Sequence, residues 1–228
     1  MSEAAHRVIA IDGPAASGKS SVARELARRL GYVYVNSGAM YRAVTWDVLE
    51  HGISPDDTAA IVRLVESAPI RCALINNRSR VFIGEVDPGP FLREDRVNNN
   101  VSQVSTVPEV RRILVAKLRH YALDHDLVVE GRDIGSVVFP DTPFKFYIDA
   151  SPEVRARRRL AEGQRDEIAL RDRVDSGRRT SPLIIAEDAL VIDSSNLTID
   201  GVIGEIIGRL KNKGLQIPES IPGGNPSP

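Results

Sequence analysis

Short apolar runs alternate with stretches of helical apolar spacing along most of this chain. Five of these runs are rich in β-branched or aromatic residues, as buried strands are. They are Val8–Asp12, Tyr32–Val35, Leu127–Glu130, Phe144–Ile148 and Ala189–Asp193. Strands that alternate with helices build a mostly parallel sheet with helices on its faces. The pattern therefore predicts an α/β fold with a core of about five parallel strands flanked by helices.

Helices are expected between these strands. Their apolar spacing predicts helices over residues 22–30, 36–51, 54–67, 91–102, 110–125 and 200–213, with another beginning after Ser151. Ser54 is expected to cap the helix that ends near residue 67, with Pro55 in its first helical position. Residues Thr106–Glu109 have the spacing of a capping box for the helix that starts at Val110.

Between residues 70 and 90 the spacing changes to the alternation that is typical of antiparallel strands. Two short runs, Ile70–Leu74 and Arg80–Ile83, are separated by the turn-like sequence Asn76–Ser79. A small antiparallel β insertion is therefore expected here. The later segment Asn98–Gln103 contains poor helix formers, so it is either a functional surface or a frayed helix end.

The first strand leads directly into a phosphate-binding motif. Gly13 and Gly18 bracket four residues, and Lys19 and Ser20 follow them, which is the spacing of a P-loop. The backbone N–H groups of such a loop wrap a phosphate, and the positive end of the next helix points at the same anion. Lys19 is expected to reach the β- and γ-phosphates of a nucleotide, and the Ser20 hydroxyl is expected to bind Mg²⁺. The alternative is a glycine-rich turn with an incidental lysine.

The whole loop is predicted to contact the nucleotide, which the family resemblance given below implies to be ATP. Its predicted ATP-binding residues are Gly13, Pro14, Ala15, Ala16, Ser17, Gly18, Lys19, Ser20 and Ser21. Among them, Ser17 and Ser21 can add hydrogen bonds to phosphate oxygens without filling the loop.

Two other strand ends carry candidate binding groups. Ser37 and Arg42 fall at the start of the helix after Tyr32–Val35, where a hydroxyl, free N–H groups and a guanidinium could together hold a second phosphate. An ordinary helix cap is the alternative explanation of this sequence. Glu130 ends another strand, where P-loop proteins place the acid that holds the Mg²⁺ shell, and a water could join it to the ion.

The composition narrows the class of protein. The chain has 228 residues, 42% of them hydrophobic, and a net charge of −1, which argues against binding to nucleic acid or to an anionic membrane. Its 25 arginines against five lysines suit bidentate phosphate recognition, although codon bias explains them equally well. Cys72 is alone and the histidines lack metal-site spacing, so neither a disulfide nor a zinc site is expected. No membrane-length apolar run or signal peptide is found, and a cytoplasmic protein is expected.

Together these motifs resemble those of the bacterial cytidylate kinases, P-loop enzymes that transfer a phosphoryl group from ATP to CMP or dCMP. The resemblance spans nearly the whole chain. It rests on Ile11–Pro14 with the P-loop, Asn36–Arg42, Ser102–Gln103, Gly131–Asp133 with Val137–Pro140, and Arg171–Arg178 before Ser181–Leu183. It implies one kinase domain over residues 1–216, with an acceptor-binding insertion over about 63–105 and a lid over about 157–180. A disordered tail is expected over residues 217–228.

The resemblance also implies roles for individual residues. The residues implied to hold the acceptor phosphate are Ser37, Arg42, Arg132 and Arg178. Those implied to face the cytosine are Ser102, Arg111 and Asp133, and those implied to reach the sugar are Arg171 and Asp175. The implied catalytic residues are Lys19, Arg132 and Arg178, with Arg157 or Arg158 of the lid as a contact to ATP phosphates.

The lid departs from the family pattern because it is short. The alternative for its arginine-rich helix is a solvated face with partners at i,i+4 spacing. Mg²⁺ is the implied cofactor, ATP and CMP or dCMP are the implied substrates, and a monomer is expected, although the sequence itself does not fix the oligomeric state.

The expected chemistry is alignment of two phosphates rather than covalent catalysis. No general base is required, because an oxygen of the acceptor phosphate is already a nucleophile, and closure of the lid is expected to exclude water. The strongest alternative function is a kinase of another small acceptor, such as UMP, a different nucleoside monophosphate or shikimate. A GTP-binding switch is less favoured, because the Asn/Thr-Lys-x-Asp and Asp-x-x-Gly motifs are absent.

Overall fold

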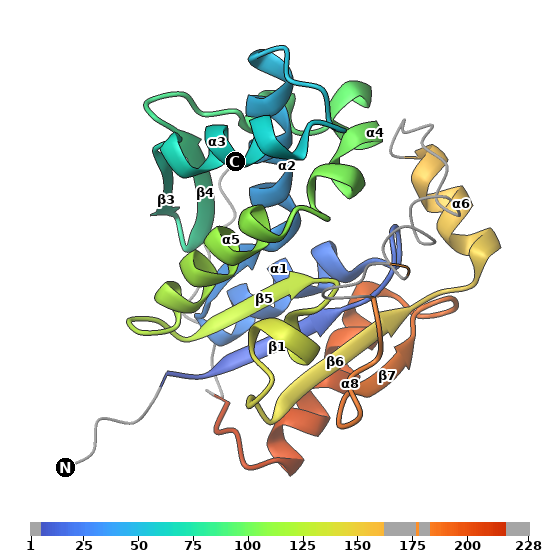
Figure 1. Ribbon diagram of the computed structural model, residues 1–228. Helices are drawn as coiled ribbons and strands as arrows, with labels where there is room; N and C mark the ends of the chain where they lie inside the picture. The colour runs from blue at the N-terminus through green and yellow to red at the C-terminus, as the bar shows by residue number, and fades with distance from the viewer. Residues whose placement is uncertain (1–5, 162–176, 178–182, 218–228) are drawn as a thin grey trace, which may run out of the picture.

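The computed structural model describes residues 6–161, 177 and 183–217, and its core is one seven-stranded sheet (Figure 1). The strands lie in the order β3-β4-β2-β5-β1-β6-β7. Their bounds are β1 Val8–Asp12, β2 Val33–Asn36, β3 Ile70–Ile75, β4 Arg78–Ile83, β5 Leu127–Gly131, β6 Phe144–Asp149 and β7 Leu190–Asp193. The neighbouring pairs among β2, β5, β1, β6 and β7 are all parallel. The predicted core of parallel strands is therefore confirmed.

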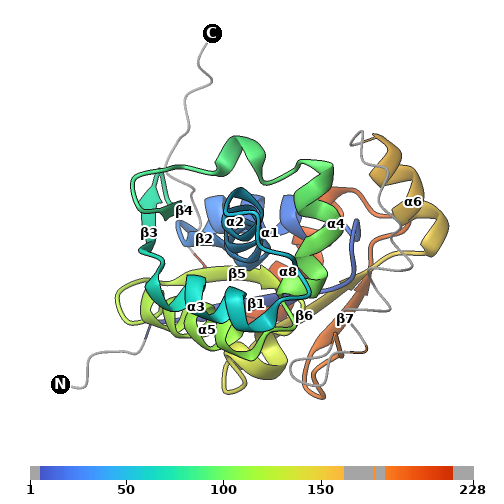
Figure 2. The same cartoon turned by 45° about the horizontal axis from the view of Figure 1, so that its top comes forward.

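Helices cover both faces of this sheet. The α-helices are α1 Lys19–Leu30, α2 Ser37–Glu50, α3 Thr58–Ser67, α4 Asp95–Val104, α5 Pro108–Tyr121, α6 Pro152–Ala161 and α8 Ile199–Asn212. One buried cluster joins the sheet to α2, α3, α4 and α5, and a second joins it to α1 and α8. Figure 2 shows α3 alongside α5 on the first of these faces. Val8 and Ala10 of β1 belong to the first cluster, and Ile9 and Ile11 belong to the second. The strand is therefore apolar from Val8 to Ile11, as expected when both faces of a sheet are covered.

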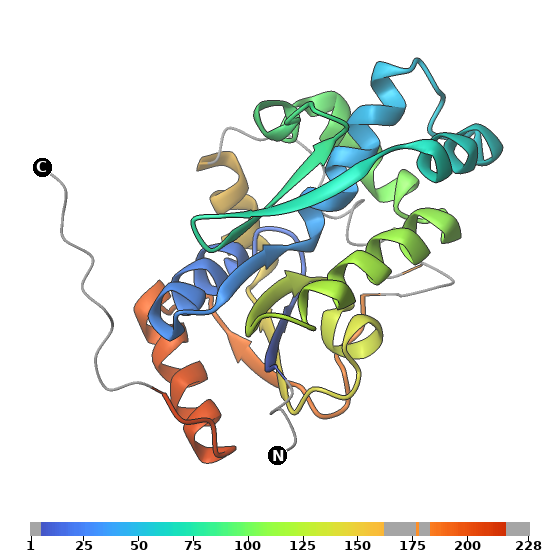
Figure 3. The same cartoon turned by 90° about the vertical axis from the view of Figure 1, so that its left-hand side faces the viewer.

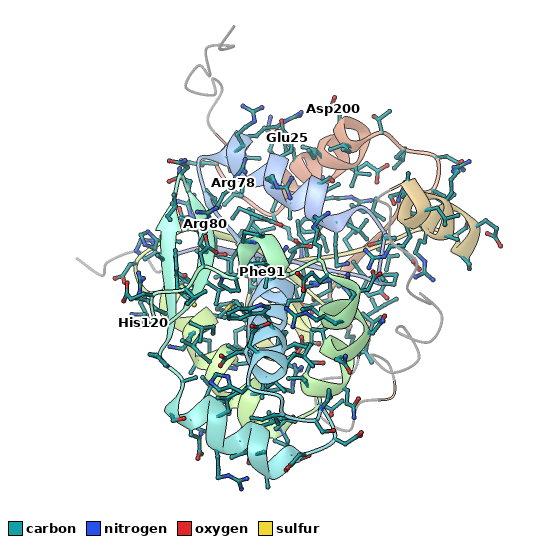
Figure 4. All side chains as sticks on the ribbon, turned by 90° about the horizontal axis from the view of Figure 1, so that it is seen from above. Glu25, Arg78, Arg80, Phe91, His120 and Asp200 are labelled. Carbon is teal, nitrogen blue, oxygen red and sulfur yellow. The ribbon has the colours of Figure 1, made fainter. Side chains whose placement is uncertain are left out.

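A charged contact links two helices of the second face at the surface. Arg29 of α1 donates to Glu25 in its own helix at 2.9 Å and also pairs with Asp200 in the first turn of α8. Figure 4 labels Glu25 and Asp200 on these neighbouring helices.

None of the helices in the described part of the chain is long and apolar enough to cross a membrane.

The antiparallel insertion is confirmed, and it is joined to the core sheet. Strands β3 and β4 pair from Ile70 opposite Ile83 to Ile75 opposite Arg78. Asn76 and Asn77 make the turn with φ of 52° and 57°, a conformation that Asn tolerates better than most residues. Tyr34 of β2 pairs in parallel with Arg78, so the hairpin extends the sheet, as Figure 3 shows.

Two predicted helix starts were wrong. Helix α3 begins at Thr58, where the side chain of Asp57 accepts from the N–H of Ala60 at 2.9 Å, so Asp57 replaces Ser54 as the cap. The expected capping box at Thr106–Glu109 is also absent: Val107 is the cap residue of α5 and Pro108 takes the first helical position. The Thr106 hydroxyl instead donates to the carbonyl of Gln103 at 2.7 Å. A proline supplies the helical φ without a side-chain cap.

The helix expected from Phe91 begins later. Phe91 closes a short 3-10 turn, Gly89–Phe91, and its ring stacks on Trp46 at 6.0 Å between centroids. Helix α4 then runs to Val104, with Asn98 buried inside it. The asparagine-rich segment is therefore not a frayed end.

Gly13 fits the P-loop closely against β6. Its φ is 150°, and a Cβ placed there would lie 2.1 Å from the backbone oxygen of Ile148. Only a residue without a side chain allows this approach. The packing of Gly13 therefore fixes where the loop leaves the sheet.

Replacing Gly13 by Ala should lower the free energy of unfolding by about 3 kcal/mol, because the new methyl group collides with backbone that cannot rotate away. Gly204→Ala is the matched control. It lies inside α8 with open space around the added methyl, so it should raise the free energy of unfolding by about 0.5–1 kcal/mol. Urea unfolding measures both, and equal effects of the two changes would contradict the close approach of Gly13.

Candidate active site

A cavity of about 470 Å³ opens at the carboxyl ends of β1, β2 and β5, where ligands bind in open α/β sheets. The P-loop, the start of α2 and the segment after β5 line it, together with residues of α4 and α5. It brings together these residues that the sequence predicted: Ala15, Ala16, Gly18, Lys19, Ser20, Ser21, Ser37, Arg42, Ser102, Arg111, Glu130, Arg132 and Asp133. Segments far apart in the chain thus meet in one polar cavity.

The P-loop presents its helix end and its lysine to this cavity. The Lys19 ammonium donates to the carbonyl of Pro14 at 2.7 Å and is largely buried. Gly18 precedes α1 with φ of 91° and makes no side-chain cap. The first N–H groups of α1 therefore meet no capping side chain, which is the arrangement that binds anions.

Not every residue of the P-loop lines the cavity. The cavity lining among the described residues does not include Gly13, Pro14 or Ser17. The Ser17 hydroxyl is buried and has no hydrogen-bond partner in the described part of the chain. The Ser17 carbonyl accepts from the hydroxyl of Ser194 at 2.8 Å. The predicted contact between the Ser17 hydroxyl and phosphate stays a prediction.

Ser20 and Glu130 meet where the sequence predicted the metal. The Ser20 hydroxyl donates to Glu130 Oε2 at 2.7 Å, and the Tyr34 hydroxyl donates to Glu130 Oε1 at 2.5 Å. Burial raises the pKa of Tyr34, and the charge of Glu130 and the hydrogen bond to it raise the pKa further. The Tyr34 hydroxyl therefore keeps its proton and stays a donor.

These oxygens fit a hard cation such as Mg²⁺. A hydroxyl and a carboxylate lie side by side at the cavity wall. Among the described residues, no group of three or more His, Cys, Asp or Glu could hold a metal ion by itself. Mg²⁺ in kinase sites uses one or two protein ligands and completes its shell with water and substrate phosphates, so the small donor set agrees with a nucleotide-bound ion.

The start of α2 supplies the groups predicted to bind a second phosphate. Asn36 caps α2 by accepting from the N–H of Ala39 at 3.0 Å, which leaves the Ser37 hydroxyl to donate to the carbonyl of Glu130 at 2.7 Å. Arg42 Nε donates to Asn98 Oδ1 at 3.4 Å, and the amide of Asn98 is held by the carbonyl of Arg93 at 2.8 Å. Asn98 therefore orients Arg42, a role that helix propensity alone could not reveal.

Arg111 and Asp133 form a buried ion pair at the α5 side of the cavity. Both side chains are only 6% exposed, and the Arg111 guanidinium also lies 5.4 Å from the ring centre of Tyr41. Ser102 lines the same cavity. This pairing joins the segment after β5 to α5.

Arg132 connects the two sides of the cavity. Its Nη1 donates to the carbonyl of Gly13 at 3.0 Å, while the neighbouring Asp133 belongs to the pair with Arg111. One turn thus carries a contact to the P-loop and a contact to α5.

Asp12 holds this turn in place and was missed by the sequence reasoning. Its two carboxylate oxygens accept from the N–H groups of Ile134 and Gly135, both at 2.8 Å. These residues begin a π-helical turn, Ile134–Val138, directly after Arg132 and Asp133. Burial raises the pKa of Asp12 to about 6, and the two N–H groups oppose this rise. An acid between a buried strand and a P-loop was the signal that could have identified it.

The arginine-rich helix α6 reaches the P-loop through Arg158, which was predicted, and through Arg155, which was not. The predicted contact of Arg158 with ATP phosphates stays a prediction. Arg158 donates to the carbonyls of Ser17 at 3.2 Å and Ser194 at 2.8 Å, and Arg155 donates to the carbonyl of Ala15 at 3.3 Å. Arg157 is exposed, whereas Arg159 and also Arg24 of α1 line the cavity. Sequence reasoning missed both of these, although Arg155 and Arg159 share a helix face by their i,i+4 spacing.

Three predicted residues, Arg171, Asp175 and Arg178, lie outside the described residues, as do most of the predicted lid and the tail from residue 218. Their predicted roles stay predictions.

Known proteins resemble this chain over nearly its whole length. A family model described as cytidylate kinase matches residues 9–212. The chain belongs to the cytidylate kinase family. The cytidylate kinase of Caldanaerobacter subterraneus subsp. tengcongensis is 44% identical over 209 residues, which cover 87% of this chain and 92% of that protein. The cytidylate kinase of Streptococcus pyogenes serotype M6 is 44% identical over 207 residues, covering 86% and 92%.

Among solved structures, the chain is similar to a gluconokinase from Sinorhizobium meliloti 1021, with 13% identity and a TM-score of 0.48 over 92% of this chain and 93% of that one. The assignment to the cytidylate kinase family rests on the sequence relatives, and it confirms the resemblance predicted from the motifs.

Replacing Asp12 by Asn should lower the free energy of unfolding by about 1–3 kcal/mol, because the amide nitrogen would face a backbone N–H and leave it unpaired. Asp149→Asn is the matched control. It ends the adjacent strand β6, and among the described residues it accepts one backbone N–H, that of Ala150. An amide oxygen can still accept this hydrogen bond, so the effect should stay within about 0.5 kcal/mol. Urea unfolding at pH 8 compares the two variants, and equal losses would contradict the two-acceptor role of Asp12.

The same variant tests the raised pKa of Asp12, which lies at about 6 in the folded chain and near 3.9 in an unfolded one. Between these values the folded protein holds a proton that the unfolded chain has released. The contribution of Asp12 to stability is therefore complete below about pH 4 and is lost as the pH rises through about 6. The difference in free energy of unfolding between the parent and Asp12→Asn should fall over this range and then level off. If this difference in free energy of unfolding does not change with pH, the raised pKa of Asp12 is contradicted.

Proposed function

We propose that this chain transfers the γ-phosphoryl group of ATP to CMP and dCMP, giving ADP and CDP or dCDP. The observation that carries the proposal is the position of Arg132. It lines the same cavity as the P-loop and the residues proposed for the acceptor phosphate, and it donates to the P-loop carbonyl of Gly13 at 3.0 Å. Membership of the cytidylate kinase family supports it. In the reaction, an acceptor phosphate oxygen bonds to the γ-phosphorus while the bond to the bridging oxygen of ATP breaks.

The residues of this chain would act by alignment and charge. The P-loop N–H groups and Lys19 bind the donor phosphates, and Lys19 stabilises the negative charge that moves to the bridging oxygen. On the other side, Ser37, Arg42 and Arg132 hold the acceptor phosphate in line with the donor. Holding both substrates in one orientation removes most of the entropic part of the barrier. No side chain has to remove a proton.

Ser20 and Glu130 would hold Mg²⁺, which when bound with ATP neutralises phosphate oxygens. The fit rests on the carboxylate and hydroxyl that meet at 2.7 Å.

The Arg111–Asp133 pair supports a site for cytosine. The Asp133 carboxylate can only accept hydrogen bonds, so it suits the amine of cytosine and repels O4 of uracil. Arg111 and Ser102 can donate to ring acceptors. The buried pair would thereby read the base by both attraction and repulsion.

The remaining assignments belong to the same proposal. Arg171 and Asp175 would reach the sugar, Arg178 would join the acceptor phosphate as a catalytic residue, and Arg157 or Arg158 would contact ATP from the lid. We further propose one kinase domain over residues 1–216, acting as a monomer in the cytoplasm without nucleic acid or membrane. The family supports this set as a whole.

The proposed activity is tested by initial rates with ATP, Mg²⁺ and each of CMP, dCMP, UMP, AMP, GMP and shikimate. CMP and dCMP should be the best acceptors. Lys19→Met should lower kcat by about 100-fold or more, corresponding to roughly 3–4 kcal/mol of lost transition-state stabilisation. Lys145→Met is the matched control, because Lys145 is also buried but pairs with Asp188, away from the lining residues. Preference for another acceptor, or a Lys19→Met variant as active as the control, would contradict the proposal.

Asp133→Asn should lower CMP turnover and shrink the CMP to UMP ratio of kcat/KM by about tenfold, or roughly 1.4 kcal/mol, because an amide can turn its donor toward uracil. The change also leaves the Arg111 charge unpaired in a buried place, so circular dichroism must first show that the variant is folded. If both acceptors lose activity together, Asp133 positions Arg111 and the base is read elsewhere.

A further inference from the structure

Tyr34 is a buried polar residue that the proposed mechanism leaves unused. It is 6% exposed and belongs to the second core cluster, which joins the sheet to α1 and α8. Its hydroxyl nevertheless points to the metal-side carboxylate, donating to Glu130 Oε1 at 2.5 Å. The same hydroxyl accepts from the side-chain amide of Asn36 at 3.3 Å. Tyr34 thus has an apolar body fixed in the core and one polar atom at the site.

The sheet register explains why this contact is rigid. Strands β2 and β5 are parallel neighbours, with Tyr34 opposite Val128 and Asn36 opposite Glu130. Tyr34 and Glu130 therefore lie diagonally across the two strands on one face of the sheet, a separation that an aromatic side chain can span. Ser20, in the first turn of α1, covers this face and donates to the other carboxylate oxygen.

The two oxygens of Glu130 consequently have separate partners. Tyr34 engages Oε1, which leaves Oε2 toward Ser20 at the cavity wall. A carboxylate held at one oxygen loses the freedom to turn about its terminal bond, which is otherwise broad. Hydrogen bonds from such outer partners orient metal-binding groups, and their loss typically weakens metal binding or activity by about 10–100-fold.

We propose that Tyr34 is a positioning residue, which fixes the Glu130 carboxylate so that Oε2 and the Ser20 hydroxyl are presented together to the divalent cation that accompanies ATP. The inference rests on the proposed function in assigning the cation to these two groups. It adds a residue from inside the core sheet to the set that determines how strongly the metal is held.

The experiment compares Tyr34→Phe with Tyr32→Phe. Both changes remove one hydroxyl from a buried ring of the same core cluster, but the Tyr32 hydroxyl accepts from Arg7 at 3.2 Å, outside the lining residues. Calorimetry measures ATP affinity with Mg²⁺ and in EDTA, without an acceptor. The ratio of the ATP affinity with Mg²⁺ to the ATP affinity in EDTA is the metal-dependent gain in ATP affinity.

In Tyr34→Phe this metal-dependent gain in ATP affinity should shrink by about tenfold, while the affinity in EDTA stays within about twofold of the parent. In Tyr32→Phe both quantities should stay within about twofold. A Tyr34→Phe variant that melts earlier but keeps the parental gain would overturn the proposal, because Tyr34 would then be only structural. A parent that gains nothing from Mg²⁺ would overturn it too.

A comparison of Glu130→Gln with the double variant Glu130→Gln/Tyr34→Phe tests whether Tyr34 acts through Glu130. In a Glu130→Gln background, adding Tyr34→Phe should change the metal-dependent gain by less than about twofold, because the group that Tyr34 orients no longer carries the charge. A further tenfold loss would mean that Tyr34 acts independently, against the proposal. These binding measurements need no acceptor, so a parent that fails to phosphorylate CMP would refute the proposed function without deciding the role of Tyr34.

Discussion

The parallel pairing of β1 with β5 is the interaction on which the site depends. Its register sets Ile11 beside Glu130 and Asp12 beside Gly131, so the P-loop and the Gly131-Arg132-Asp133 turn leave the sheet side by side. Parallel strands end at the same edge, which is why two segments far apart in the sequence can line one cavity. The carboxylate of Asp12 then ties the two exits together through the N–H groups of Ile134 and Gly135.

The site gathers buried charges that would be costly if left alone, and each of those described has a specific partner. Asp12 accepts two backbone N–H groups, Glu130 accepts from Ser20 and Tyr34, and Asp133 is paired with Arg111. Removing a charge from water is unfavourable unless hydrogen bonds replace the lost hydration. These partners therefore replace the hydration that the three carboxylates lose on burial, and they fix where each carboxylate lies beside the cavity.

Much of the fold was predictable because its signals are local. The apolar run before Gly13 and the spacing of Lys19 identify a strand, a P-loop and a helix from a few adjacent residues, and Leu127–Glu130 identifies a second strand end with its acid. One feature was missed because a distant partner decides it: the pairing of Tyr34 with Arg78 joins the hairpin to the core sheet. The cap of α3 was wrong for a local reason, because Ser54 and Asp57 are both suitable cap residues and lie only three positions apart. For the site, the family resemblance implied roles for Arg111 and Asp133, but only the fold revealed their pairing and the presence of Arg159 and Arg24 in the cavity.

The place of β1 inside the sheet has a consequence for how the chain folds. Its two neighbours in the described sheet, β5 and β6, come from residues 127–131 and 144–149. During synthesis, β1 therefore has neither of these partners until more than a hundred further residues have been made. Contacts of such long sequence separation form slowly, because the entropy of closing the intervening loop opposes them. The phosphate loop next to β1 therefore acquires its shape late in folding, and a truncated chain that ends before β5 cannot assemble it.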